Sequence, residues 1–314
     1  MIMRLLPKCH LLVFSRLQWE HSLDGIAGKA RALHIPILFD IDDLVFDLRY
    51  LRLVTNTLNV HFGSHVDYDF WTAYFSRIGM TAELADGFTT TNSFLGERLT
   101  EKYGKPYQVV VNSLNEEQLL VSELCRKKKQ KKKSIPPYTI GYFSGTPSHI
   151  NDFKVICPEM MELLRDHQDI VLRVVGFMEF PPSLKDHIRS GRICFTPLVD
   201  FLELQQLIAG VDVNVVPLVN NTFTNCKSEL KFFEAAAVGT VTAATPTFTY
   251  SRAIEDSVSG YLCEPGQWYD RIEALYKHPE TAEKMVDEAW SLCSQNYSPE
   301  KLREQLDAAY QFFT

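Results

Sequence analysis

The sequence lacks the marks of several protein classes. None of its seven cysteines forms a Cys-x-x-Cys pair, so we expect no zinc site and no disulfide framework, but buried free thiols in a reducing compartment. No apolar run is as long as a membrane span, and the one at the start is too short for a signal peptide. The net charge of −7 gives no long-range attraction to nucleic acid. These absences predict a cytoplasmic protein without a nucleic-acid partner or a bound metal.

What the sequence does contain is a regular alternation of apolar and amphipathic segments. Its 314 residues, 46% of them hydrophobic, are enough for two domains of ordinary size. The alternation predicts an α/β protein with two Rossmann-like parallel sheets. Strands are expected at residues 10–15, 35–40, 87–91, 108–112, 138–143, 170–175, 211–217, 240–244 and 260–263. The main helices are expected at residues 23–33, 93–103, 152–166, 201–209, 227–238 and 299–313.

A block of basic residues separates the two halves. Residues 126–133 are basic except for Gln130, and a Ser-Ile-Pro-Pro segment follows. Like charges running into a double proline predict a solvated linker at 126–137. It would join an N-terminal domain, 1–125, to a C-terminal domain, 138–314, whose last helix could pack back on the first domain. A less favoured alternative is contact of Arg126–Lys133 with an anionic membrane, at the inner membrane face, worth about 1 kcal/mol per basic residue.

The most informative segment is the expected helix that begins near Lys227. At about 100° per residue, Lys227, Lys231 and Glu234 fall within an arc of roughly 60°. Two lysines in the first turns oppose the helix dipole, unless an anion binds at the helix start. Glu234, one turn further on, could accept hydrogen bonds from sugar hydroxyls. The pattern therefore indicates a nucleotide sugar; the alternative is a surface helix with a Lys231–Glu234 ion pair.

A second candidate segment follows the first strand of the C-terminal half. It contains Ser144, Gly145, Ser148 and His149. The glycine would let the backbone approach a ligand, and the next helix start would offer N–H groups and the His149 side chain to a phosphate. The alternative is an ordinary turn with a histidine bonded to the backbone.

Two further segments also follow expected strands. Thr245 opens a loop that could line a base or sugar pocket, or could be a plain proline turn. Residues 40–43 carry three carboxylates, Asp40, Asp42 and Asp43. These could hold a divalent metal, act as a base, bind a hydroxylated acceptor, or merely cap backbone N–H groups.

These segments resemble a known enzyme family. Residues 140–145 with Ser148 and His149, together with 227–245 and 260–264, are similar to the donor-binding domain of GT-B-fold retaining glycosyltransferases of family 4, or group 1. Residues 39–47 resemble a segment found in a bacterial polysaccharide branch of that group. The resemblance covers most of residues 138–314 and, more loosely, 10–112.

The resemblance implies two domains facing a cleft, with the nucleotide on the second. It implies a metal-independent transfer of a hexose from a UDP- or GDP-linked donor, without a cofactor, to a glycan or lipid-linked acceptor. Lys227 and Lys231 would neutralise the diphosphate in the transition state, and Glu234 would hold the ribose. Asp42 or Asp43 would face the acceptor.

The sequence departs from the family at two points, which keep alternatives open. The family has two glutamates eight positions apart; the second matches Glu234, but Cys226 stands at the first. The N-terminal domain looks short and lacks a Gly-rich loop, so a non-catalytic nucleotide-sugar-binding subunit is one alternative. The other is a haloacid-dehalogenase-like phosphatase with Asp40 as nucleophile and Asp42 as acid. The sequence predicts no oligomeric state.

Overall fold

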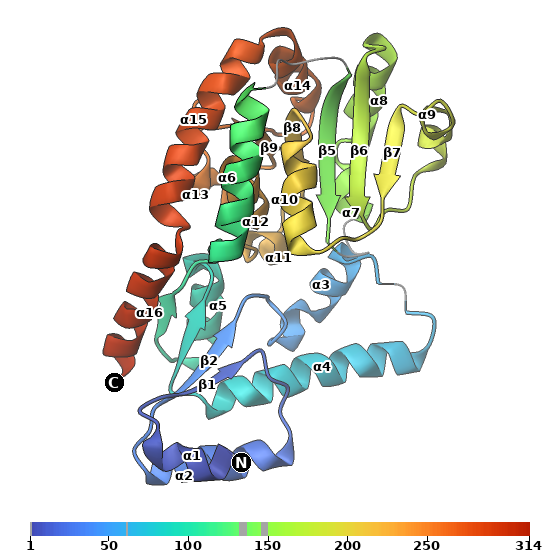
Figure 1. Cartoon of the computed structure of the whole chain (residues 1–314). Helices are drawn as coiled ribbons and strands as arrows, with labels where there is room; N and C mark the ends of the chain where they lie inside the picture. Colours follow the sequence, from blue (N-terminus) through green and yellow to red (C-terminus); the bar gives the residue numbers. More distant parts are fainter. Residues whose placement is uncertain (1, 61, 132–136, 146–149) are drawn as a thin grey trace. The chain divides into compact units, whose positions relative to one another are not determined.

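The computed structural model describes residues 2–60, 62–131, 137–145 and 150–314 (Figure 1). The chain divides into two compact units. Unit 1 contains Met1–Asn112, Asn225–Ser228 and Glu300–Thr314. Unit 2 contains Ser113–Thr224 and Glu229–Pro299. Both have a parallel sheet and helices, and this confirms the α/β class predicted from the strand and helix alternation.

Unit 1 is built on a four-stranded parallel sheet in the order β1-β2-β3-β4. In register, Phe14, Phe39 and Phe88 lie opposite one another on neighbouring strands, and each is buried. Aromatic side chains at matching positions therefore pack across the sheet on one face. The strands are β1 (Leu12–Ser15), β2 (Ile37–Ile41), β3 (Gly87–Thr90) and β4 (Tyr107–Val109).

The helices of unit 1 have clear sequence signals at their ends. Ser64 and Asp67 form a capping box at the start of α4, and the Asn92 side chain accepts from the Leu95 N–H at the start of α5. Gly104 ends α5 with a left-handed φ of 66°. The helical segments are α1 (Ile2–Leu5), η1 (Leu6–Lys8), α2 (His21–Ala32), η2 (Leu48–Tyr50), α3 (Leu51–Thr57), α4 (His65–Leu84), α5 (Ser93–Tyr103) and α16 (Pro299–Phe313).

The last helix, α16, belongs to unit 1 except for its first residue. The Gln305 side chain accepts from the Val111 N–H at 2.9 Å. A Cβ atom at Gly87 would lie 2.2 Å from the Phe313 ring, so β3 needs a glycine where this ring packs on it.

Unit 2 has a six-stranded parallel sheet in the order β10-β9-β8-β5-β6-β7. The chain starts in the middle, at β5, adds β6 and β7 on one side, and then crosses to build the other side from β8. The strands are β5 (Tyr138–Ser144), β6 (Ile170–Gly176), β7 (Ile193–Thr196), β8 (Val213–Val216), β9 (Val241–Ala244) and β10 (Tyr261–Leu262).

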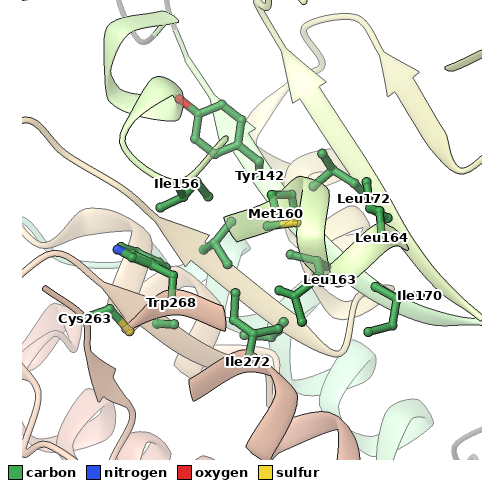
Figure 2. Packing of buried hydrophobic residues seen from close by; sticks show 14 of the residues in the cluster. Tyr142, Ile156, Met160, Leu163, Leu164, Ile170, Leu172, Cys263, Trp268 and Ile272 are labelled. Carbon is green, nitrogen blue, oxygen red and sulfur yellow. The ribbon is translucent and has the colours of Figure 1, made fainter. Parts of the chain in front are cut away.

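Helices cover the sheet of unit 2 and close an apolar core. Figure 2 shows part of this core, where Met160 and Leu163 from α8 pack with Leu172 from β6 and Trp268 from α14. Trp268 is fully buried. The helical segments are α6 (Glu116–Lys131), α7 (Ile150–Lys154), α8 (Cys157–Asp166), η4 (Pro182–Leu184), α9 (Lys185–Arg189), α10 (Phe201–Ala209), α11 (Thr222–Asn225), α12 (Leu230–Ala237), α13 (Tyr250–Ala253), α14 (Trp268–Lys277) and α15 (Pro279–Asn296).

The predicted linker at 126–137 differs from the structure, because its first half completes helix α6. This helix packs beside α10 (Figure 1), and Lys129 donates to the Val211 carbonyl at 2.7 Å and to Thr240 Oγ1 at 2.6 Å. Glutamates occupy the first turn of α6 and lysines the last turn, which is the distribution that the helix dipole favours. The basic block is therefore a helix end; residues 132–136 lie outside the described residues.

Two smaller expectations also need correction. Not all thiols are buried: Cys9 and Cys194 are exposed and Cys125 is half-buried, although all seven cysteines are free. The helix expected at 152–166 is two helices, α7 and α8, because Pro158 occupies the first turn of α8. Within the described residues, no helix is long and apolar enough to cross a bilayer.

Candidate functional site

In unit 2 the order of strands reverses between β5 and β8, and ligands of such sheets bind beyond the carboxyl ends of the strands at that point. Ser144 is the last residue of β5, and its carbonyl accepts from the Phe177 N–H at 3.1 Å. Gly176 ends the neighbouring β6 with a φ of 103°, and a Cβ atom there would lie 1.8 Å from the Ser144 carbonyl oxygen. This close approach holds the end of β5 against β6. Gly145 is exposed next to it, whereas Ser148 and His149 lie outside the described residues.

The lysine-bearing helix starts later than the sequence pattern predicts. Helix α12 begins at Leu230, so Lys231 is in its first turn and Lys227 precedes it. The Lys231 carbonyl accepts from Asn214 Nδ2 of β8 at 3.0 Å, and its Nζ lies 5.8 Å from the ring centroid of Tyr142 in β5. The Lys231 side chain therefore lies near β5, and its backbone carbonyl is bonded to β8; these two strands flank the reversal.

Glu234 lies one turn further along α12 and is only 7% exposed. Burial raises the pKa of its carboxyl to about 7, although the positive charge of Lys231 opposes that rise. Glu234 makes no hydrogen bond or ion pair to any residue that the structure describes, so the predicted alternative of a Lys231–Glu234 ion pair is wrong. The Glu234 oxygens are not among the fully buried atoms without a partner in the described residues, so the carboxylate keeps some contact with solvent and could accept hydrogen bonds from a ligand there.

Thr245 is buried, and its hydrogen bonds hold the loop that follows β8 at the carboxyl ends of the strands. Its Oγ1 accepts from the Leu218 N–H at 2.9 Å, and its own N–H donates to the Val216 carbonyl at 3.1 Å. The Asp152 carboxylate accepts from the Val219 N–H at 2.9 Å. Thr245 and Asp152 thus fix the loop that follows β8, and Asp152 is a residue that the sequence analysis did not identify.

In unit 1, Asp40 links three strands. Its two carboxylate oxygens accept from Ser15 Oγ at 2.9 Å and from Thr89 Oγ1 at 2.8 Å. These hydrogen bonds explain its position and leave the phosphatase alternative, with Asp40 as nucleophile, without structural support. No group of residues suited to a metal ion occurs in the described ranges.

The neighbouring carboxylates, Asp42 and Asp43, pair with cations. Arg16 Nη1 lies 2.8 Å from Asp42 Oδ1, and Arg16 Nη2 lies 3.0 Å from Asp43 Oδ2. Lys227 Nζ is 3.4 Å from the other oxygen of Asp43. Burial would raise the pKa of Asp43, but Lys227 and Arg16 together lower it below its ordinary value. Asp43 is therefore an ionised carboxylate shared by two cations.

Cys226, at the position of the first family glutamate, is fully buried. Burial raises the pKa of its thiol to about 12, so the thiol stays neutral. The Cys226 carbonyl accepts from Asn92 Nδ2 at 2.7 Å. This hydrogen bond fixes the segment in front of Lys227 within unit 1.

The predicted site residues thus fall in both units. Lys227 does not share a helix face with Lys231 and Glu234, because residues 226–229 are not helical. Unit 2 holds Ser144, Gly145, Lys231, Glu234 and Thr245. Unit 1 holds Asp42, Asp43 and Lys227, joined by Arg16, which the sequence analysis missed.

Comparison with known proteins agrees with this architecture. Residues 137–278 match the family model described as glycosyl transferases group 1. No curated protein matches the sequence. Among solved structures, HepE of Anabaena in complex with UDP has a TM-score of 0.66 at 13% identity, covering 99% of this chain and 81% of its own. Sucrose-phosphate synthase of Thermosynechococcus elongatus has a TM-score of 0.65 at 14% identity, covering 97% of this chain and 74% of its own.

A glycosyltransferase from Rickettsia africae is similar to the same extent, with a TM-score of 0.65 at 14% identity and coverage of 99% of this chain and 79% of its own. At such identities the likeness establishes the fold, and the family match over 137–278 adds the enzyme class. Residues 137–278 therefore match the family of group 1 glycosyl transferases, and the chain has the GT-B fold of two Rossmann-like units.

Proposed function

We propose that the protein transfers a hexose, with retention of configuration and without a metal, from a nucleoside diphosphate sugar to a hydroxyl of a glycan or lipid-linked acceptor. The observation that carries this proposal is the Glu234 carboxylate, which is buried beside Lys231 and has no donor among the described residues. Ribose hydroxyls of a nucleotide would supply the missing hydrogen bonds.

The start of α12 suits the diphosphate. The N-cap residue of this helix, Glu229, does not cap the first turn with its side chain, and its carboxylate accepts instead from the Tyr297 hydroxyl at 2.7 Å. Its backbone N–H groups and the Lys231 ammonium would stabilise the charge that develops on the leaving diphosphate. The sequence also predicts that Lys227 is a second phosphate ligand. It further predicts that Ser148 and His149 contact the phosphate.

We infer the donor base from a protein of the same fold and the acceptor side from Asp42. HepE, which shares the fold, is described with UDP and with UDP-glucose, so UDP is our first choice over GDP. Asp42 is half exposed at the carboxyl end of β2, where its carboxylate could accept a hydrogen bond from an acceptor hydroxyl. Contact of the basic end of α6 with an anionic membrane is a further prediction.

Binding of UDP, measured by isothermal titration calorimetry, tests the donor site. We expect the wild type to bind and Lys231→Ala to lose at least about tenfold in affinity, since a buried charge-assisted contact is worth about 1.5–3 kcal/mol. Lys284→Ala, an exposed lysine of α15, is the matched control and should bind like the wild type. Equal affinities of Lys231→Ala and Lys284→Ala would remove Lys231 from the site.

Turnover tests the transfer itself. In the absence of an acceptor, the enzyme should hydrolyse UDP-glucose to glucose and UDP, and an enzyme-coupled assay measures the UDP. If no metal takes part, this hydrolysis should proceed in the presence of EDTA. A reaction that EDTA abolishes and Mg²⁺ restores would contradict the metal-independent mechanism.

A further inference from the structure

Asn214 is a polar residue in the middle of an otherwise apolar strand. The other three residues of β8 are valines, all of them buried, and Asn214 itself is only 1% exposed. Its Nδ2 donates to the Lys231 carbonyl at 3.0 Å and to Thr242 Oγ1 at 3.2 Å. We infer that Asn214 is a positioning residue of the transferase, which fixes the first turn of α12 so that Lys231 meets the donor diphosphate. The inference rests on the proposed function.

The sheet of unit 2 places Asn214 beneath the first turn of α12. Asn214 and Thr242 occupy matching positions on the neighbouring strands β8 and β9, so their side chains lie on the same face of the sheet. Helix α12 packs against β9, and Lys231 is its second residue. All three residues belong to unit 2. Asn214 therefore connects the start of the helix to the sheet within one compact unit.

A second buried side chain holds the backbone of Lys231. Tyr250, the first residue of α13, is 2% exposed, and burial raises the pKa of its hydroxyl well above the ordinary value. A hydrogen bond from the backbone of Lys231 opposes this rise. The backbone of Lys231 is thus bonded to side chains of β8 and of α13. Its side chain, which lies near β5, therefore extends from a fixed point of the fold.

An asparagine at this position has a cost that an apolar residue would avoid. Asn214 Oδ1 is buried and has no hydrogen-bond partner among the described residues. A buried acceptor without a donor destabilises the folded state, and a leucine of similar volume would carry no such atom. The stability of the core therefore does not explain Asn214. The hydrogen bond from its Nδ2 to the Lys231 carbonyl does, because it fixes the helix turn that carries the proposed phosphate ligand.

Substitution by leucine separates positioning from stability, with UDP as the probe. Asn214→Leu keeps the volume but removes both hydrogen bonds, so we expect UDP affinity to fall about three- to tenfold, the range for one hydrogen bond. Thr242→Val is the matched control, because it removes one bond of the same amide and leaves the bond to Lys231. It should bind UDP within about twofold of the wild type. Isothermal titration calorimetry measures the affinities.

A double-mutant cycle shows whether Asn214 acts through Lys231. In the Lys231→Ala background, Asn214→Leu should weaken UDP binding by less than about twofold, because the side chain that Asn214 positions is then missing. A merely structural role would give the same loss in both backgrounds. Urea unfolding shows that each variant is folded when binding is measured. If Asn214→Leu does not fold, Asn214→Ala takes its place in the cycle.

The outcomes separate this inference from the proposed function. If the wild type binds UDP more tightly than Lys231→Ala does, the donor site stands whatever Asn214 does. Unchanged affinity in Asn214→Leu, an equal loss in Thr242→Val, or an equal loss in both backgrounds of the cycle would then overturn the inference alone. Equal affinities of the wild type and Lys231→Ala would remove the proposed donor site and this inference with it.

Discussion

Burial of the Glu234 carboxylate lowers the stability of the folded protein, and we propose that this carboxylate binds the donor. Its carboxyl lies among buried residues of α12, and Phe233 beside it stacks on Tyr297 with centroids 4.4 Å apart. Such packing excludes water, and burial is the main cause of the raised pKa. A protein retains a buried group of this kind when the group has a task that a neutral residue cannot perform.

The raised pKa of Glu234 predicts how stability depends on pH. The folded pKa, about 7, lies above the ordinary value of 4.5, so the folded state keeps a proton that the unfolded chain releases. The contribution of this group is therefore fully present below about pH 4.5 and is lost as the pH rises through about 7. Glu234→Gln should remove this loss, and above pH 8 it should be more stable than the wild type by on the order of 2–3 kcal/mol.

Urea unfolding of wild type and Glu234→Gln at pH 5 and pH 8 measures the difference. The two proteins should be close in stability at pH 5 and should diverge at pH 8. If the difference in stability between the two proteins were the same at pH 5 and at pH 8, the Glu234 carboxyl would titrate in its ordinary range.

The close contact between the ends of β5 and β6 predicts that Gly176 cannot be replaced without loss of stability. An added Cβ would meet the Ser144 carbonyl oxygen at 1.8 Å, and the φ of 103° is unfavourable for other residues. Gly176→Ala should therefore destabilise unit 2 by about 2 kcal/mol or more, and should weaken UDP binding by displacing the end of β5. Gly191→Ala is the matched control: its φ is 75°, but no atom lies within 4 Å of the added Cβ.

Chemical unfolding gives the free energies of both glycine variants. Gly191→Ala should cost only the left-handed backbone, about 1–2 kcal/mol, with UDP affinity unchanged. If the two variants behaved alike, the contact with Ser144 would contribute nothing beyond the backbone conformation.

Elements with a strong cap or a fully apolar face could be predicted from the sequence. Helix α5 matches the predicted range 93–103 because Asn92 caps its start and Gly104 ends it, and α10 matches 201–209 because the Asp200 side chain accepts from two N–H groups of its first turn. Strand β7 was missed because Cys194 and Phe195 are both exposed, so neither alternation nor a continuous apolar run marks it.

The parts of the candidate site that depend on local sequence could be predicted. The parts that depend on tertiary contacts could not. Lys231 and Glu234 share one helix, so their spacing alone relates them. Lys227 lies outside that helix, since residues 226–229 are held by the bonds of Cys226 and Glu229 to Asn92 and Tyr297. Arg16 reaches Asp42 only through the parallel pairing of β1 and β2, which no short pattern contains.

Each of the two units has its own sheet and its own tryptophans. Trp19 and Trp71 belong to unit 1, and Trp268 and Trp290 belong to unit 2. The variant Trp19→Phe/Trp71→Phe therefore emits only from unit 2, where Trp268 is part of the core in Figure 2. Its fluorescence reports the unfolding of the unit that carries Lys231 and Glu234.

UDP should stabilise that unit by mass action. At 100 times its dissociation constant, a ligand that binds only the folded state adds about 2.7 kcal/mol, which corresponds to a rise in the unfolding midpoint of about 5–10 °C for a unit of this size. We expect this shift in Trp19→Phe/Trp71→Phe. At the same UDP concentration it should fall to about half or less when Lys231→Ala is added, because a tenfold weaker affinity leaves about 1.4 kcal/mol of stabilisation. An undiminished shift in the Lys231→Ala background would place the nucleotide away from Lys231, and no shift in the parent variant would argue against a UDP site on unit 2.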